Sequence, residues 1–124
     1  SIAEDFISSG WFIRRYYEAT GRKVAGVKEL VAGYENEAII RLLFVEFGKN
    51  LGTFINTFIE MQHPKLIIVG GNISNAWSLF EIEMKSQIYS HHPGIDIRKS
   101  VHGENAALIG AVGSWFTKQS GVAL

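Results

Sequence analysis

Two adjacent glycines, Gly70 and Gly71, are the residues whose type and position first indicate a binding function. They directly follow residues 66–69, an uninterrupted run of branched apolar side chains (LIIV), and they precede Asn72 and Ser74. Because glycine carries no side chain, a ligand such as a nucleotide can lie against bare backbone at this point. An ordinary turn between a strand and a helix would use the same glycines. The sequence contains no GxxxxGKS/T or GxGxxG motif that would decide between the two interpretations.

Acidic side chains and histidines are the other candidates for chemistry. Glu4 and Asp5 lie near an interrupted helix start, where they either favour the helix dipole or reach a ligand hydroxyl. His91 and His92 lie before a Pro-Gly turn and have no acidic or thiolate partner at ligand spacing in the sequence. We therefore expect solvated loop histidines and assign no metal ligand.

Helical patterns precede the glycine pair. Apolar residues recur at helical spacing over residues 4–20, where Ser9 and Gly10 interrupt the pattern and predict that the long part of the helix begins near them. Gly21 is suited to ending this helix because it tolerates a positive φ. A second and longer helix is predicted over residues 35–61, which present a broad apolar face.

The longer helix contains Gly48 and Gly52, one turn apart. Either another backbone approaches the helix closely there, or the helix tolerates a cost of about 1 kcal/mol for each glycine. The polar connector before it, residues 22–37, carries a short helical patch at residues 27–32. Aromatic side chains on both helices fall at helical spacing and are expected to pack in a core or an interface. They are Trp11, Phe12, Tyr16, Phe47, Phe54 and Phe58.

Extended and helical patterns alternate in the second half of the chain. Residues 66–69 predict a strand buried on both faces, followed by a helix capped by Ser74 or Asn75. Residues 95–98 alternate as a half-buried or edge strand would, and a last helix is predicted over residues 105–118. This order indicates a layered α/β domain, whose ligands gather at the carboxyl ends of the strands. Two strands make a poor sheet, so further strands are expected upstream.

The composition restricts the class of protein. Hydrophobic residues make up 47% of the 124 residues and charged residues 19%, which favours one folded domain over disorder. The 12 basic and 12 acidic residues cancel and form no basic run, so direct nucleic-acid binding and attraction to an anionic membrane are disfavoured. The apolar runs are too short to span a bilayer. The absence of cysteine excludes disulfides and thiolate metal sites, and we expect a cytoplasmic protein.

Residues 4–8, 52–74 and 99–111 form three segments that, in this order, resemble the carboxyl-terminal half of the ROK family, which groups bacterial sugar kinases such as glucokinase with sugar-responsive repressors. Residues 4–8 (EDFIS) look like the family's Glu-x-x-x-Ser segment. Residues 52–74 resemble its helix, proline, apolar strand and Gly-Gly-x-Ile-Ser stretch. Residues 99–111 are similar to its closing Ala-Ala-x-x-Gly-Ala segment. The similarity covers residues 3–115, and residues 1–124 are accordingly expected to be a carboxyl-terminal lobe fragment of a longer protein.

The resemblance implies an α/β fold, a partial actin-like (ribonuclease-H-like) ATPase lobe with helices packed on a small, mostly parallel sheet. It assigns nucleotide binding to Gly70 and Gly71, with Asn72 and Ser74 as neighbours of the nucleotide, and sugar binding to Glu4. The implied cofactor is ATP with Mg²⁺. In the family the catalytic aspartate and the first phosphate loop belong to the other half of the protein. No catalytic residue is therefore assigned here, and the fragment alone is not expected to be active.

One departure from the family pattern bears on function. Many members have a cysteine-rich zinc motif whose last cysteine falls two residues before the sugar-contact glutamate, where this chain has Ile2. A family-type zinc site is therefore not expected. The leading hypothesis is a lobe of an ATP-dependent hexose kinase, and the alternative is a sugar-sensing lobe of a ROK-type transcriptional repressor. A plain oligomerisation module that pairs through the aromatic first helix is a third hypothesis. The expected partners are a sugar, ATP, the missing amino-terminal lobe and a further copy of the chain in a homo-oligomer.

Overall fold

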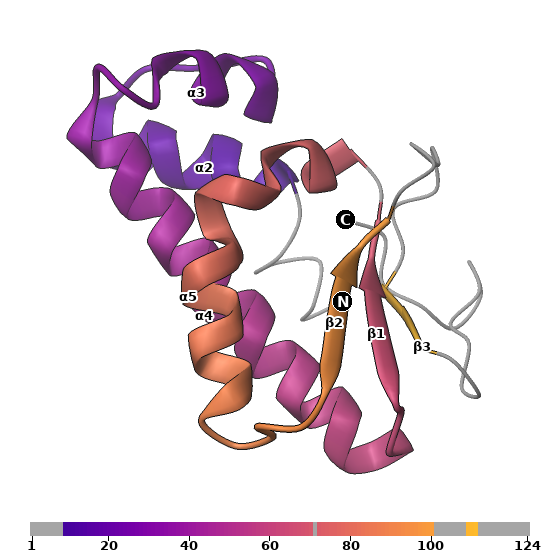
Figure 1. The fold of residues 1–124 in the computed structure, drawn as a ribbon. Helices are drawn as coiled ribbons and strands as arrows, with labels where there is room; N and C mark the ends of the chain where they lie inside the picture. The colour runs from indigo at the N-terminus through magenta and orange to yellow at the C-terminus, as the bar shows by residue number, and fades with distance from the viewer. Residues whose placement is uncertain (1–8, 71, 101–108, 112–124) are drawn as a thin grey trace.

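Helix α4 (Ala38–Gln62) is the long element against which the other helices pack (Figure 1). The computed structural model describes residues 9–70, 72–100 and 109–111 of the chain. Helices α4 and α5 form one layer, and they lie on one face of a small sheet that forms the other layer (Figure 1). The remaining described elements are α2 (Ser9–Thr20), α3 (Val27–Gly33), β1 (Leu66–Val69), the 3-10 helix η1 (Asn72–Ala76), α5 (Trp77–Tyr89), β2 (Asp96–Lys99) and β3 (Ile109–Ala111).

Helix α2 begins and ends at the predicted residues. Its first residue is Ser9, and it stops at Gly21, which has a φ of 74° and donates its backbone N–H to the Tyr17 carbonyl at 2.7 Å. The left-handed conformation costs glycine little, which explains why the chain turns here. Helix α3 likewise covers the predicted patch of residues 27–32 and ends at Gly33.

Aromatic side chains join α2, α4 and α5 into one core. The Phe12 ring lies 4.8 Å from the rings of both Phe44 and Phe47, centroid to centroid, and the Phe47 ring lies 5.1 Å from that of Phe80. The six aromatic residues predicted to pack do so, since Phe54 is partly buried and the other five are buried. The aromatic stripe of α2 therefore faces α4 of the same chain and is not free to pair with another copy.

The two glycines of α4 form a seam against α5. A Cβ built on Gly48 would lie 2.8 Å from the Phe80 carbonyl oxygen, and one built on Gly52 would lie 2.8 Å from the Met84 carbonyl oxygen. Real Cβ atoms essentially never come this close to another heavy atom. Close backbone approach is thus the correct interpretation of these glycines, because any side chain would push the two helices apart.

The sheet has the strand order β2-β1-β3. Strands β1 and β2 are parallel, with Leu66 opposite Asp96 and Val69 opposite Lys99. In β1 the side chains of Ile67 and Val69 are fully buried, whereas those of its other two residues are only half-buried. The prediction of a strand buried on both faces is therefore wrong for the described residues, because α4 and α5 both lie on the same face (Figure 1). Strand β2 has one buried residue, Ile97, and is the edge strand that its alternating pattern predicts.

Two local predictions differ from the structure. Residues 109–111, predicted to be helical, form strand β3 and pair antiparallel with β1, with Gly110 opposite Ile68. This pairing satisfies backbone groups that β1 would otherwise leave open at its edge. The rest of the predicted helix lies outside the described residues. Helix α5 is preceded by η1 and has Ala76 at its N-cap, so neither Ser74 nor Asn75 caps it. A 3-10 turn can itself satisfy amides at a helix start, which makes a side-chain cap dispensable.

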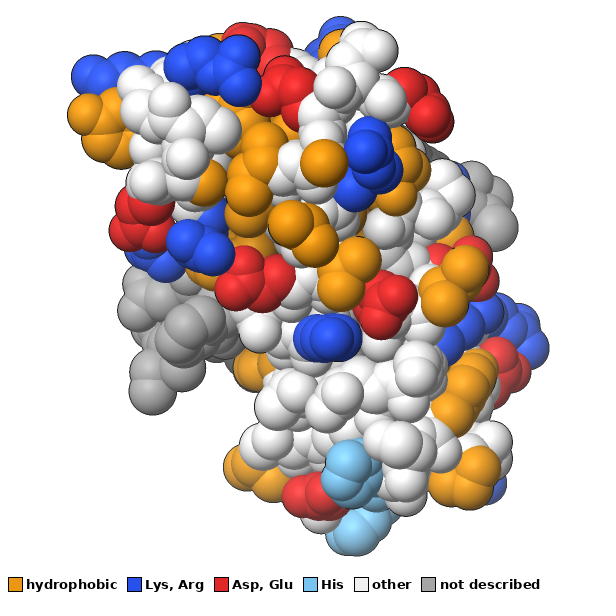
Figure 2. Space-filling view, turned by 90° about the vertical axis from the view of Figure 1, so that its left-hand side faces the viewer, with side chains coloured by type: hydrophobic (Ala, Val, Ile, Leu, Met, Phe, Trp, Pro, Cys, Tyr) orange, Lys and Arg blue, Asp and Glu red, His pale blue; other side chains and the backbone are white. Residues whose placement is uncertain are grey.

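Some large hydrophobic side chains remain at the surface of the described residues. Figure 2 shows hydrophobic side chains gathered on the helical face of the molecule, with charged side chains around them. The most exposed are Ile82, Met61 and Leu42, at 76%, 69% and 63% of their full accessible surface. Leu42 belongs to α4 and Ile82 to α5, so both helices of this layer carry an exposed apolar residue.

Candidate functional site

The carboxyl edge of the parallel strand pair is the candidate site. Strands β1 and β2 end side by side at Val69 and Lys99, and the Ser100 N–H donates to the Val69 carbonyl oxygen at 2.9 Å. This last bond extends the ladder one residue past β2 and fixes the start of the glycine turn. Gly70 follows at once and is buried, and the backbone of Asn72 opens η1 two residues later. Gly70 therefore lies at the edge where ligands of parallel sheets are generally found.

Two buried residues fix η1 to the core beside this edge. Ile73 is 5% exposed and Ala76 is 4% exposed. Because both anchors belong to η1, its backbone, including that of Asn72 and Ser74, is held against the core at the end of β1. The segment after the glycine turn, η1, is thus packed on the core and is not a free loop.

The start of helix α5, directly after η1, is stabilised by contacts of Trp77. Trp77 packs against Phe80 with ring centroids 5.9 Å apart, and the Lys85 ammonium lies 5.6 Å from the Trp77 ring centroid. Lys85 also donates to the Glu81 carboxylate at 2.7 Å, which raises the pKa of Lys85 above its ordinary value of 10.5. A lysine that stays charged over a tryptophan face gains cation–π attraction, so this contact helps to fix the first turns of α5.

The structure brings together part of the predicted site. Gly70 and the backbone of Asn72 and Ser74 lie at the same edge, and their assignment to a nucleotide stays a prediction. Gly71 and Glu4 lie outside the described residues, so the sugar-binding side of the prediction stays a prediction. Lys99 and Ser100 are at this edge too, and sequence reasoning did not select them. The sequence gives little indication of these two residues, because only the pairing of β1 with β2 places residue 99 beside residue 69.

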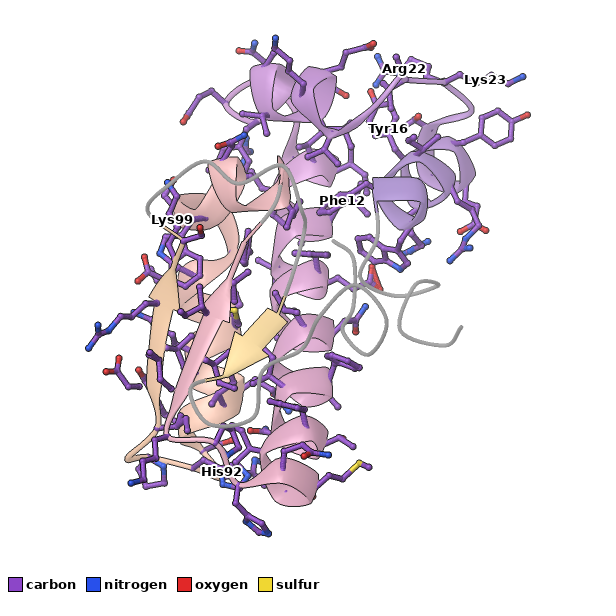
Figure 3. All side chains as sticks on the ribbon, turned by 90° about the vertical axis from the view of Figure 1, so that its right-hand side faces the viewer. Phe12, Tyr16, Arg22, Lys23, His92 and Lys99 are labelled. Carbon is purple, nitrogen blue, oxygen red and sulfur yellow. The ribbon has the colours of Figure 1, made fainter. Side chains whose placement is uncertain are left out.

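The paired histidines lie far from this edge, at the other end of the strands. His92 Nε2 is 3.7 Å from Glu60 Oε1, and His91 Nδ1 is 2.9 Å from the Ser90 hydroxyl oxygen. Figure 3 shows His92 at the end of the molecule opposite to Lys99. Glu60 of α4 is the acidic neighbour of His92, and it is distant in the sequence, so the prediction that no acidic partner lies at ligand spacing along the chain is not contradicted. In the part of the chain that the structure describes, no group of three or more potential metal ligands is found.

Helices packed on one face of a parallel strand pair, with a glycine turn at its carboxyl edge, define an α/β protein with a candidate ligand site at that edge. Comparison with protein-family models matches residues 4–119 to the ROK family. The chain belongs to the ROK family, as its sequence segments predict. Comparison with curated proteins gives no match.

The fold is similar to that of a ROK hexokinase from Thermus thermophilus, known from its crystal structure. The TM-score is 0.69 with 15% sequence identity, and the match covers 81% of this chain and 35% of the hexokinase chain. This chain therefore matches about a third of the length of that enzyme. At this low identity the likeness shows the fold alone, and it confirms the predicted α/β class and the partial kinase fold. None of the described helices is long and apolar enough to cross a membrane.

Proposed function

We propose that this chain is the carboxyl-terminal, nucleotide- and sugar-binding lobe of an ATP-dependent sugar kinase that acts on a hexose. The observation that carries the proposal is the position of Gly70 at the carboxyl edge of a parallel strand pair in a ROK-family chain. The likeness of the fold to part of a ROK hexokinase supports it. The adenosine of ATP would lie on the turn at Gly70 and Gly71, next to Asn72 and Ser74.

The residue types at this edge suit a phosphorylated nucleotide. The described residues here are Gly70, Asn72, Lys99 and Ser100, and they include no carboxylate. Among these described residues, an anionic phosphate chain would meet backbone groups and the side chains of Lys99 and Ser100. The absence of cysteine from the chain does not suit a thiolate zinc site, so no zinc is part of the proposal.

The lobe would contribute to catalysis mainly by positioning ATP and the sugar, and not by supplying a group that takes part in the phosphoryl transfer. ATP, with Mg²⁺ on its phosphates, supplies the transferred phosphoryl group. Phosphoryl transfer depends mainly on alignment and on stabilisation of charge, so a fixed adenosine shelf at Gly70 and Gly71 would place the phosphates, and Glu4 would hold sugar hydroxyls. The base and the phosphate loop would come from the amino-terminal lobe. For this reason the isolated chain should bind ATP and sugar but should not transfer the phosphoryl group.

The full-length protein allows a direct test with ATP and a panel of hexoses and amino sugars, following ADP release. Gly71→Val should raise the KM for ATP roughly tenfold or more and leave the KM for the sugar almost unchanged, because a side chain would stand where the nucleotide lies. Glu4→Gln should do the reverse and raise the KM for the sugar. Gly94→Ala is the matched control, because a Cβ there meets nothing within 4 Å.

The proposal fails if no sugar is turned over and Gly71→Val leaves nucleotide affinity unaltered. Sugar binding without turnover, combined with sugar-dependent release of DNA by the full-length protein, would instead support the repressor lobe. The two functions also differ upstream of this segment: a phosphate loop with a catalytic aspartate belongs to a kinase, and a helix-turn-helix to a repressor.

A further inference from the structure

Lys99 lies at the carboxyl edge of the strand pair, beside the residue that precedes the glycine turn. It is the last residue of β2, its Cα pairs with that of Val69, and its side chain is exposed. Neighbouring strands lie about 4.8 Å apart, so the flexible four-carbon stem of Lys99 spans the distance to the turn that begins at Gly70. Figure 3 shows Lys99 at the end of β2, on the same side of the molecule as η1.

The strand pattern sets the direction of this side chain. Successive side chains in a strand point to opposite faces, so Lys99 shares a face with Ile97. Ile97 is 5% exposed and belongs to the core under the helices. Lys99 therefore projects on the helix side of the sheet, where η1 follows the glycine turn, and Arg98 projects on the opposite side.

The charged side chains that the structure describes near Lys99 are paired with other partners. Arg98 is held by Asp96 through two bonds, Nη2 to Oδ2 at 2.7 Å and Nε to Oδ1 at 3.2 Å, and this carboxylate raises the pKa of Arg98 above its ordinary range. Lys85 is held by Glu81 at 2.7 Å. Within residues 9–70, 72–100 and 109–111, no carboxylate forms an ion pair with Lys99. Exposed lysines often lack partners, so it is the position beside the glycine turn that distinguishes this one.

Resting on the proposed function, we propose that Lys99 binds the phosphate chain of the nucleotide that lies on the Gly70 turn. An ammonium acts on phosphate as a compact point charge and needs no bidentate geometry. It would favour nucleoside di- and triphosphates over the unphosphorylated nucleoside. The glycine backbone would then recognise the adenosine, and Lys99 would add selectivity for the phosphates.

The test compares ATP, ADP and adenosine binding by calorimetry in the full-length protein and its variants. Lys99→Ala should weaken ATP and ADP binding roughly tenfold, which corresponds to one charge-assisted contact, and should leave adenosine binding unchanged. Lys99→Arg should restore most of the affinity. The matched control is Lys65→Ala, which removes the same charge. Lys65 is also exposed, but it precedes β1 at the opposite end of the sheet.

Salt gives a second readout that a structural role would not move. ATP affinity of the unmodified protein should fall more steeply with ionic strength than that of Lys99→Ala, because one screened attraction has been removed. Equal losses for ATP and adenosine, or equal losses in the Lys65 and Lys99 variants, would overturn the assignment. Failure of the unmodified protein to bind any nucleotide would overturn the proposed function itself, whereas normal ATP binding by Lys99→Ala would overturn only the role of Lys99.

Discussion

At the scale of single residues, one phenol joins the end of α2 to the start of α4. Tyr16 donates its hydroxyl to Glu37 Oε1 at 2.7 Å, and Arg22 Nη2 donates to the same oxygen at 2.7 Å. The Arg22 guanidinium carbon also lies 5.4 Å from the Tyr16 ring centroid (Figure 3). The hydrogen bond to Glu37, and then burial, raise the pKa of Tyr16 above its ordinary value of 10.0.

This raised pKa predicts a loss of stability at high pH. The folded protein keeps the phenol proton to a higher pH than the unfolded chain does, so the bond contributes fully below about pH 10 and is lost as the pH rises through the folded-state pKa. Urea unfolding between pH 8 and pH 11 should therefore show a smaller fall in stability for Tyr16→Phe than for the unmodified protein. Tyr17→Phe is the control, because Tyr17 is 48% exposed. Identical pH profiles for the two variants would contradict the prediction.

Some residue-level features could not be predicted from the sequence because they depend on distant partners. Asn56 is only 6% exposed and donates its amide to the Gln87 carbonyl at 3.0 Å, across the contact between α4 and α5. Nothing local marks this asparagine, which lies among apolar residues of a long helix. The Glu60 neighbour of His92 was missed for the same reason. In contrast, Gly21 was identified because its conformational role is local.

At the scale of elements, the close contact between α4 and α5 predicts which glycine tolerates substitution. Gly52→Ala places a Cβ 2.6 Å from Gln87 Cβ and 2.8 Å from the Met84 carbonyl oxygen. Overpacking of this kind costs about 1–3 kcal/mol, which outweighs the gain of about 1 kcal/mol from replacing a helical glycine. Chemical denaturation should show a net loss of stability. Gly94→Ala should be nearly neutral, and a Gly52→Ala protein more stable than the unmodified one would contradict the close contact.

Elements with strong local patterns were predicted well, and those that depend on pairing were not. Helices α2 and α4 and strand β1 follow from apolar periodicity with glycine or proline at their ends. Strand β3 was predicted as helix, because small residues such as Ala107 and Ala111 favour a helix locally while an open edge of β1 selects a strand. The edge position of the candidate site was predictable from the glycine pair. The position of Lys99 at this edge was not predictable, because it depends on the register between β1 and β2.

At the scale of the whole molecule, the described helices leave large apolar side chains exposed. Leu42 and Ile82 are 63% and 76% exposed, on the two helices of one layer. The chain also matches only 35% of the length of the hexokinase it resembles. Contiguous exposed apolar surface on a folded protein often marks a site of contact with another protein surface.

We accordingly expect the isolated chain to self-associate, and light scattering should give a mass above that of one copy. The double variant Leu42→Lys/Ile82→Lys should reduce this mass, because charge opposes burial of the helical face. Met61→Lys is the control, because Met61 is 69% exposed but lies in the last turn of α4. A clean monomer of the unmodified chain would count against both the fragment interpretation and a homo-oligomer.

The glycine seam also limits how α4 and α5 can move against each other. Phe80 and Met84 lie against Gly48 and Gly52, so a slide of one helix along the other would bring a residue with a side chain into a gap that admits only hydrogen. The close contact therefore resists sliding of α4 against α5. In the proposed two-lobed kinase, a hinge would accordingly lie outside the α4–α5 layer.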